Sequence, residues 1–258
     1  MRSIQKRMQM LSIDDYNNYS DYLKANPQEF NDLFNSIEIN VTSFFRDAQT
    51  WDYIATKLIP NIISRKLESE PIRVWSAGCA SGEETYSLAI LLAEVLGVEQ
   101  FQARVKIFAT DIDRDALQQA RMGRYSVNTV ASIDPARLTK YFTQINNCYV
   151  FHKHLKHQIV FSQHNLFKDA PMSKIDLLMC RNVLIYLTTE AQIRVLTRFY
   201  FSLTSSGFLC LGKAEMLPIK SVPIFSLINH QNHIFTKIPK QHLDQYMLHQ
   251  PLGQPPLS

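Results

Sequence analysis

The stretch that most constrains the fold is residues 72–86, IRVWSAGCASGEETY, where an apolar run meets two glycines and a helical pattern. Residues 72–77 are rich in apolar, β-branched and aromatic side chains, which predicts a buried strand. Gly78 and Gly82 follow, and leucines at helical spacing continue toward Gly97, a residue suited to end a helix. A strand, a glycine turn and a helix form the nucleotide-binding end of an α/β unit, because glycine lets the backbone turn sharply beside a ligand.

The spacing and charge of this turn indicate which ligand it holds. The pattern is Gly-x-x-x-Gly rather than the Gly-x-Gly-x-x-Gly of dinucleotide-binding turns. Glu83 and Glu84 occupy the start of the helix, where a pyrophosphate would need uncovered N–H groups. An acidic rim instead suits S-adenosylmethionine, which carries a sulfonium and an amino group. Ordinary strand-to-helix turns share so short a pattern, so the motif alone only favours this cofactor.

Composition narrows the class of protein. The 258 residues are 46% hydrophobic, enough for one large core and a small second domain. The formal charge of +4 is far below that of a nucleic-acid binder, so no nucleic-acid partner is expected. The four cysteines form no Cys-x-x-Cys pair, which argues against zinc and favours reduced thiols in the cytoplasm. No apolar run reaches the roughly 18 residues of a membrane span, so no membrane insertion is expected.

Residues 1–62 are expected to form a small helical domain with a linker helix. The opening helix is expected to expose its basic residues, Arg2, Lys6 and Arg7. Ser12 and Asp15 suggest a capping box for a second helix, and Asn26 suggests the cap of a third. The run NVTSFFRD that follows, taken alone, is a linker pinned by its two phenylalanines. Asp47 is expected to cap the helix after it.

Residues 70–238 are expected to form an α/β domain with its ligand at the carboxyl ends of the strands. A second buried strand at residues 105–109 is followed by Asp111 and Asp113. Asp113 is suited to cap the next helix, so Asp111 is left for the hydroxyls of a ribose. Thr189 is expected to cap a later helix. Further core strands are expected at residues 175–180, 208–212 and 233–237.

A small antiparallel element is expected within this domain. Residues 148–161 alternate apolar and polar side chains, which predicts a hairpin and then a core strand; the hairpin subdomain is placed at residues 144–160. Three nearby histidines lack Cys or acidic partners at ligand spacing, so a basic solvated face is favoured and no metal is expected: His152, His154 and His157. Residues 239–258 are rich in Gln, Pro and His and are expected to be a disordered tail.

Five motifs occur along the chain in one order: NVTSFFRD, WSAGCASGEETYSLA, FATDID, Asn165-Leu166 and CRNVLIYL. Together they resemble the CheR family of S-adenosylmethionine-dependent methyltransferases, which esterify glutamates on bacterial chemoreceptors. The resemblance reaches to about residue 238. It implies an all-helical N-terminal domain and a doubly wound, Rossmann-like α/β methyltransferase domain with an inserted antiparallel subdomain. The short opening resembles CheR modules inside longer fusion proteins, which predicts that this chain is a piece of one.

The resemblance also implies the residues around S-adenosylmethionine and its product, S-adenosylhomocysteine. It agrees with the local pattern on Glu84 for the amino group and Asp111 for the ribose. It adds Arg46 and Tyr186, which are expected beside the transferred methyl group as the catalytic residues. The full cofactor set is expected to be Asn40, Thr42, Arg46, Ala77, Gly78, Glu84, Asp111, Asn165, Leu166, Arg181 and Asn182.

The expected partners are the cytoplasmic helices of methyl-accepting chemoreceptors, bound by a monomer in the cytoplasm. The basic first helix is expected to contact them, with Lys153 and Lys156. Family members that tether to a receptor's C-terminal pentapeptide carry glycines in the subdomain turn. Here no glycine lies between Gly123 and Gly207, so no pentapeptide tether is expected. A nucleic-acid methyltransferase is disfavoured by CRNVLIY after the fourth strand, and a catalytically idle, cofactor-binding scaffold is the remaining alternative.

Overall fold

The structure is a computed structural model that describes residues 2–29, 33, 42–218 and 224–238. The chain forms two units, residues 1–41 and 42–258. The boundary therefore lies about twenty residues before the expected one at residue 62. The reason is packing, since Phe44, Trp51 and Ile54 are buried in the core of the second unit. The expected tail at residues 239–258 lies outside the described residues.

The first unit contains helices α1 (Arg2–Met10) and α2 (Tyr16–Ala25). Its described core is small and apolar and consists of Met8, Tyr19 and Leu33, with Ile4, Leu11, Ile13 and Leu23 packed against it. Asp15 itself caps α2, because its carboxylate accepts the N–H groups of Asn17 and Asn18. Ser12 is not the cap, so the expected capping box is wrong.

Arg7 is a structural residue of this unit and not the exposed cation that the sequence predicted. Its guanidinium binds the carboxylate of Glu29 at 2.5 Å, and its side chain is only 19% exposed. The Tyr19 hydroxyl donates to the same carboxylate at 2.7 Å. Arg7 lowers the pKa of Glu29, while burial and Glu29 raise the pKa of Tyr19 to about 12. The side chains of Arg2 and Lys6 lie outside the described part.

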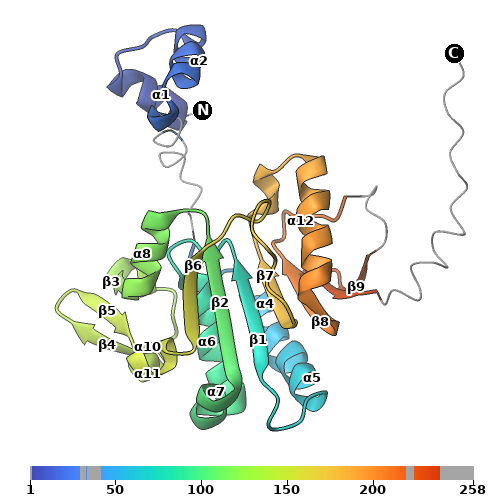
Figure 1. The fold of residues 1–258 in the computed structure, drawn as a ribbon. Helices are drawn as coiled ribbons and strands as arrows, with labels where there is room; N and C mark the ends of the chain where they lie inside the picture. The colour runs from blue at the N-terminus through green and yellow to red at the C-terminus, as the bar shows by residue number, and fades with distance from the viewer. Residues whose placement is uncertain (1, 30–32, 34–41, 219–223, 239–258) are drawn as a thin grey trace, which may run out of the picture. The chain divides into compact units, whose positions relative to one another are not determined.

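The second unit is built on a seven-stranded sheet in the order β6-β2-β1-β7-β8-β10-β9 (Figure 1). The strands are β1 (Ile72–Ala77), β2 (Val105–Asp111), β6 (Ile159–Gln163), β7 (Ile175–Cys180), β8 (Leu203–Leu211), β9 (Phe225–Asn229) and β10 (Ile234–Lys237). Strand β1 pairs in parallel with β2 on one side and β7 on the other, and β10 runs antiparallel between β8 and β9. The strand order therefore changes direction at β1, where doubly wound sheets bind ligands.

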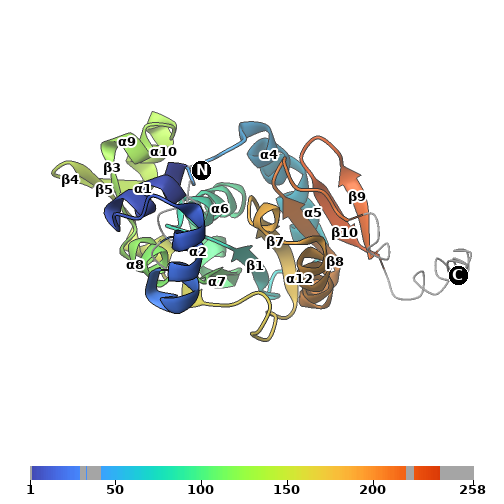
Figure 2. The ribbon, with the colours of Figure 1, turned by 90° about the horizontal axis from the view of Figure 1, so that it is seen from above.

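Helices cover both faces of this sheet. The side chains of β1 alternate: Ile72 and Val74 join the core cluster that holds α6 (Glu83–Leu96), and Trp75 and Ala77 join the cluster that holds α12 (Thr189–Ser202). Figure 2 shows α6 and α12 on opposite sides of the strands. The first face also holds α4 (Ala48–Tyr53), a π-helical turn (Ile54–Leu58), α5 (Ile59–Ser64) and α7 (Val98–Arg104). Among the described helices, none is long and apolar enough to cross a membrane.

Two helix caps test the local sequence patterns. Helix α8 (Arg114–Met122) begins at Asp113, whose carboxylate accepts the N–H groups of the first turn, and ends at Gly123 with φ of 61°. Both ends confirm the prediction. Helix α12 is capped by Thr188 and not by Thr189, because the Thr188 hydroxyl accepts the Ala191 N–H at 3.4 Å.

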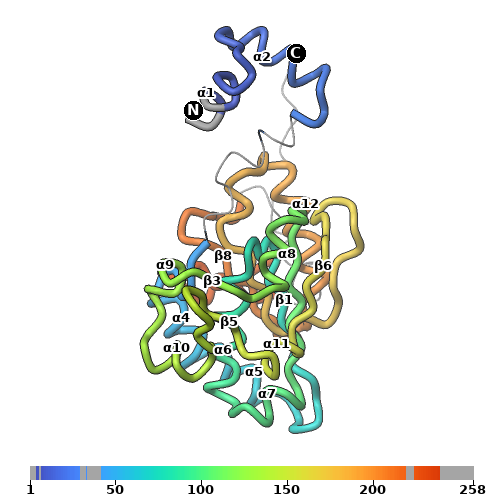
Figure 3. The backbone as a smooth tube through the Cα atoms, turned by 90° about the vertical axis from the view of Figure 1, so that its left-hand side faces the viewer, coloured from blue at the N-terminus to red at the C-terminus, as the bar shows by residue number. Residues whose placement is uncertain are grey.

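The inserted element is a three-stranded antiparallel sheet in the order β3-β5-β4. Its strands are β3 (Arg124–Ser126), β4 (Phe142–Ile145) and β5 (Cys148–Phe151), with the short helices α9 (Val127–Val130), α10 (Pro135–Tyr141) and α11 (Lys153–Lys156) around it. The hairpin therefore ends before the expected residue 160, because α11 follows β5 and β6 joins the main sheet. Figure 3 shows this group beside α8 and the β6 edge.

Candidate active site

The turn after β1 is held in one conformation by close packing around its glycines. Gly78 has φ of 76°, and Gly82, with φ of 98°, precedes α6. A Cβ atom on Gly78 would lie 2.3 Å from Cγ2 of Val183, so no side chain fits there. The N–H groups of Gly78 and Cys79 both donate to the carbonyl of Thr110 in β2. Ala77, the last residue of β1, is fully buried. The turn is therefore fixed by its hydrogen bonds to β2 and by the packing of Val183 on Gly78.

Asp111 lies at the carboxyl end of β2, beside this turn. One carboxylate oxygen accepts the Ala80 N–H at 2.8 Å and the other accepts the Asp113 N–H at 3.0 Å. Each oxygen keeps a second lone pair, so the carboxylate can also accept hydroxyl groups from a ribose. Burial raises the pKa of Asp111, and the backbone hydrogen bonds partly offset that rise.

Glu84 projects from the first turn of α6 toward the ends of β1 and β7. Its carboxylate accepts the Ser76 hydroxyl at 3.2 Å and lies 3.5 Å from the guanidinium of Arg181. Burial raises the pKa of Glu84, and Arg181 opposes that rise. Glu84 and Asp111 both lie close enough to Cys79 to help burial raise the pKa of its thiol. The two acidic groups thus flank one turn.

Arg181 follows β7 and connects this site to the segment before α4. Its side chain is 2% exposed and binds Asp47 at 2.5 Å, and its guanidinium lies 5.8 Å from the Trp51 ring centre. Asp47 has φ of 64° and makes no side-chain cap to α4, so the expected capping role is wrong. The Asp47 carboxylate instead binds the guanidinium of Arg181 and lies 3.6 Å from the ammonium of Lys213.

The segment before α4 is pinned as the local pattern predicted. Phe44 is buried, and the Phe45 N–H donates to the Ser87 hydroxyl of α6 at 3.0 Å. The carbonyl of Arg46 accepts the Trp51 indole N–H at 2.8 Å, while the Arg46 side chain is exposed. Arg46 therefore sits on a fixed backbone with its guanidinium at the surface.

The other expected residues lie in several settings. Thr42 is half-buried, and Asn40 lies outside the described residues. The Asn165 side chain accepts the N–H groups of Phe167 and Lys168, so it shapes its own turn, and Leu166 packs against the core of the α12 face. Tyr186 ends a short 3₁₀ helix (Leu184–Tyr186) and is 53% exposed.

The sequence patterns missed Glu215, which is 2% exposed. Its carboxylate accepts the N–H groups of Gly212 and of the segment after β7, Asn182, Val183 and Leu184. The available signal was an acidic residue three positions after the glycine that follows β8. Within the described residues, no cluster of three or more His, Cys, Asp or Glu side chains could hold a metal ion.

The mostly parallel sheet, its glycine turn and the acidic groups beside that turn define a protein of the S-adenosylmethionine-dependent methyltransferase class. The chain belongs to the CheR methyltransferase family. Residues 40–234 match the S-adenosylmethionine-binding domain of CheR methyltransferases, and residues 1–37 match their all-α domain. S-adenosylmethionine is therefore the cofactor of this protein, as the sequence predicted.

Several bacterial proteins are similar to most of the chain. An uncharacterised 104.1 kDa protein of Rhodobacter capsulatus is 33% identical over 91% of this chain, which spans only 24% of that protein. The chemotaxis protein methyltransferase of Borreliella burgdorferi is 31% identical, over 81% of this chain and 77% of its own length. That of Salmonella typhimurium is 33% identical, over 81% and 73%. The large Rhodobacter relative is consistent with the expected fusion module.

Proposed function

We propose that this chain is a protein-glutamate O-methyltransferase that modifies methyl-accepting chemoreceptors in chemotaxis adaptation or a related signalling array. The observation that carries the proposal is the set of Glu84, Asp111 and Arg181 at the carboxyl edge of the sheet, in which Arg181 is buried and the two carboxylates are half-buried. It occurs in a family whose similar members include chemotaxis protein methyltransferases. Such a substrate would place the enzyme in the cytoplasm.

The charges of the site fit the cofactor. Glu84 would bind its amino group, and Asp111 would bind its ribose hydroxyls. Arg181 would hold its carboxylate while remaining neutralised by Asp47. When bound, the cofactor supplies the electrophilic methyl group. Gly78 adopts φ of 76°, which glycine holds without strain, so the turn can keep the sharp bend that brings its backbone beside a ligand.

The reaction needs alignment more than proton transfer. A glutamate side chain, with a pKa of about 4.3, is already ionised at neutral pH, so no general base is required. Sulfonium and carboxylate lose charge as they react, and water slows that step by solvating the separated charges. Orientation of the two groups can lower the barrier by roughly 7–11 kcal/mol. The task of the protein is therefore to align the acceptor and exclude water.

Arg46 and Tyr186 are the proposed acceptor-side residues. Both side chains are exposed, so an incoming receptor helix can reach them. The Arg46 guanidinium would hold the glutamate carboxylate, and the Tyr186 hydroxyl would steer it toward the methyl group. The indole of Trp51 supports this assignment, since its hydrogen bond to the Arg46 carbonyl fixes the backbone that carries the guanidinium.

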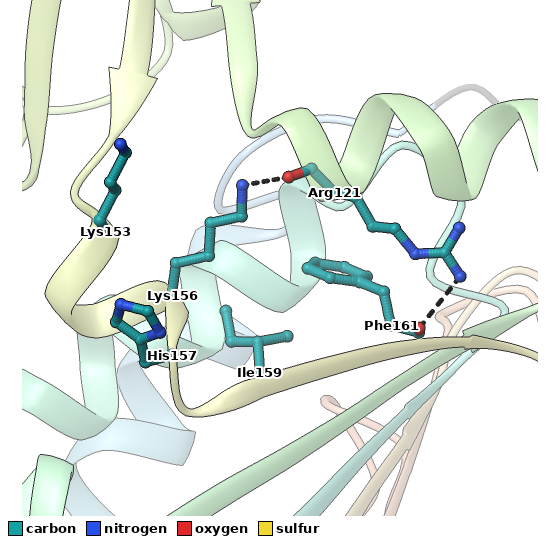
Figure 4. Close-up of a pocket in the computed structure, with 6 residues that line it drawn as sticks. All are labelled: Arg121, Lys153, Lys156, His157, Ile159 and Phe161. Atoms are coloured by element: carbon teal, nitrogen blue, oxygen red, sulfur yellow. Dashed lines mark hydrogen bonds between the residues drawn. The ribbon is translucent and has the colours of Figure 1, made fainter.

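Receptor helices are proposed to bind directly and without a tail tether. The β4–β5 turn is built from Asn146, with φ of 54°, and Asn147, and it contains no glycine. A cleft of about 470 Å³ next to the β6 edge offers a basic surface (Figure 4); it is lined by Arg121, Lys153, Lys156, His157, Ile159 and Phe161.

The lysines of this cleft differ in availability. The Lys156 ammonium donates to the carbonyls of Arg121 and Met122 at the end of α8, so it stabilises that helix end. Figure 4 shows Lys153 directed away from the Arg121 carbonyl. Lys153 is therefore the better candidate for an acidic partner. Arg7 is no longer proposed to contact the receptor, because its guanidinium is bound to the carboxylate of Glu29.

The test is transfer of a radiolabelled methyl group from S-adenosylmethionine to receptor cytoplasmic fragments. Labelled protein that releases its label in mild base is expected, since glutamate methyl esters hydrolyse there. Wild-type protein that binds the cofactor but labels none of the fragments would favour the idle scaffold instead.

A further inference from the structure

Glu215 is a buried carboxylate whose partners are all backbone N–H groups. One oxygen accepts from Val183 at 2.7 Å and from Leu184 at 2.6 Å. The other accepts from Asn182 at 2.9 Å and from Gly212 at 2.5 Å. Among the ion pairs of the described residues, no lysine or arginine is bound to it. Its whole hydrogen-bonding capacity is therefore directed at the backbone.

This arrangement joins the carboxyl ends of β7 and β8. An ionised carboxylate offers about four acceptor positions, so Glu215 satisfies four donors that would otherwise be buried without partners. Asn182 adopts φ of 61°, a conformation that side-chain-bearing residues rarely hold unless their surroundings impose it. The Glu215 carboxylate is the group that binds the N–H of this residue.

The segment that Glu215 holds, residues 182–184, is connected to the glycine turn and to the first turn of α6. Arg181 immediately precedes it, and its guanidinium lies 3.5 Å from Glu84. Val183 lies within it, and its side chain fills the space that a Cβ on Gly78 would need. A shift of this segment would therefore move both the charge beside Glu84 and the wall of the glycine turn.

We propose that Glu215 is a positioning residue for cofactor binding, which fixes residues 182–184 so that Arg181 and Val183 keep the β1 turn in its binding shape. This rests on the proposed function only in that the turn binds S-adenosylmethionine. Glu215 touches neither cofactor nor acceptor, and its effect passes through the backbone.

Replacement of Glu215 by Gln tests the proposal with almost no change of volume. A carboxamide has one acceptor oxygen, so two of the four N–H donors would face its NH2 group. The Kd for S-adenosylhomocysteine, measured by calorimetry on folded protein, is expected to rise at least about tenfold. The KM for S-adenosylmethionine should rise by more than kcat falls, whereas the KM for the receptor fragment should change little.

Asp176 provides a matched control at the opposite end of β7. It is also a buried carboxylate, which accepts the Arg73 N–H at 2.9 Å and pairs with Lys66 at 3.0 Å. Asp176→Asn should lower Tm but leave the Kd for S-adenosylhomocysteine within about twofold of wild type. Unchanged affinity in Glu215→Gln, or an equal loss in Asp176→Asn, would overturn the proposal.

Hydrogen exchange on the wild-type chain covers the case in which Glu215→Gln does not fold. The amides of Asn182, Val183, Leu184 and Gly212 should be protected before cofactor is added, and rapid exchange of these amides would contradict the proposal. None of these binding measurements needs an acceptor. A wild-type protein that binds S-adenosylhomocysteine but methylates no receptor would refute the proposed function and leave this inference standing.

Discussion

At the scale of single residues, the candidate site is a set of charges around the buried Arg181 that neutralise one another. Arg181 lies between the carboxylates of Asp47 and Glu84, and Lys213 approaches Asp47 from the other side. Removing one member of such a set leaves another charge buried without a partner, which costs more than the pair itself contributes. Substitutions here should therefore affect cofactor binding strongly.

Asp111→Ala should weaken binding of S-adenosylhomocysteine by tenfold or more, about 1.4 kcal/mol. The carboxylate is proposed to accept ribose hydroxyls, and it also holds the Ala80 N–H of the glycine turn. Calorimetry on the purified variant measures the change. An affinity equal to that of wild type would place the ribose elsewhere.

Cofactor affinity should fall as the pH is lowered from 7 to 5. Burial raises the pKa of Glu84 above its ordinary value of 4.5, so it takes up a proton at a higher pH than an exposed glutamate and stops attracting the amino group. The same shift means that the contribution of Glu84 to folding stability is fully present below its unfolded-state pKa. That contribution is lost as the pH rises through its folded-state pKa. Glu84→Gln should bind the cofactor weakly, with an affinity that varies less with pH. A wild-type cofactor affinity that does not change with pH would argue against this role.

At the scale of elements, local patterns predicted what local forces build. The β1 strand, its glycine turn, α6 and the Asp113 cap of α8 appear where the sequence placed them, since each depends on neighbours within a few residues. Asp47 was misassigned because its partner Arg181 lies 134 residues further along the chain. Glu215 was missed for the same reason, as its bonds to the segment after β7 span 31 to 33 residues. The edge strand β9 is short and mostly exposed, so it lacks a buried-strand pattern.

Arg7→Met should destabilise the first helical unit by about 1–3 kcal/mol, because it leaves the buried Glu29 carboxylate with fewer donors. Lys24→Met is the matched control: its pair with Asp21 is exposed, at 74% and 76% for the two side chains, and is expected to matter by less than about 0.5 kcal/mol. Denaturant unfolding of both variants makes the comparison. Equal losses would mean that the Arg7–Glu29 pair has no special structural role.

At the scale of the whole molecule, the residues proposed for the cofactor and those proposed for the acceptor differ in exposure. Arg181 is buried and Glu84 and Asp111 are half-buried in the second unit, whereas Arg46 and Tyr186 are exposed on it. The fold class, the cofactor and the family could be predicted from five short motifs, because four of them lie at or just after the ends of strands, where doubly wound sheets bind ligands. The domain boundary could not, since the burial of Phe44 and Trp51 depends on the assembled core.

Arg46→Ala and Tyr186→Phe should each lower methyl transfer to receptor fragments at least about tenfold while leaving Tm unchanged. The Tyr186 variant removes only an exposed hydroxyl, so its affinity for S-adenosylhomocysteine should equal that of wild type. Steady-state kinetics and thermal unfolding measure both effects. Normal turnover by both variants would show that the acceptor site lies elsewhere.

The identity of the methylated atom tests the central claim most directly. Receptor cytoplasmic fragments are incubated with the wild-type chain and S-adenosylmethionine, digested and sequenced by tandem mass spectrometry. Methyl groups are predicted on glutamate side chains, and they should disappear when the mapped glutamates are replaced by alanine. Methylation of lysine or of other side chains, or unmodified fragments in the presence of bound cofactor, would contradict the assignment as a protein-glutamate O-methyltransferase.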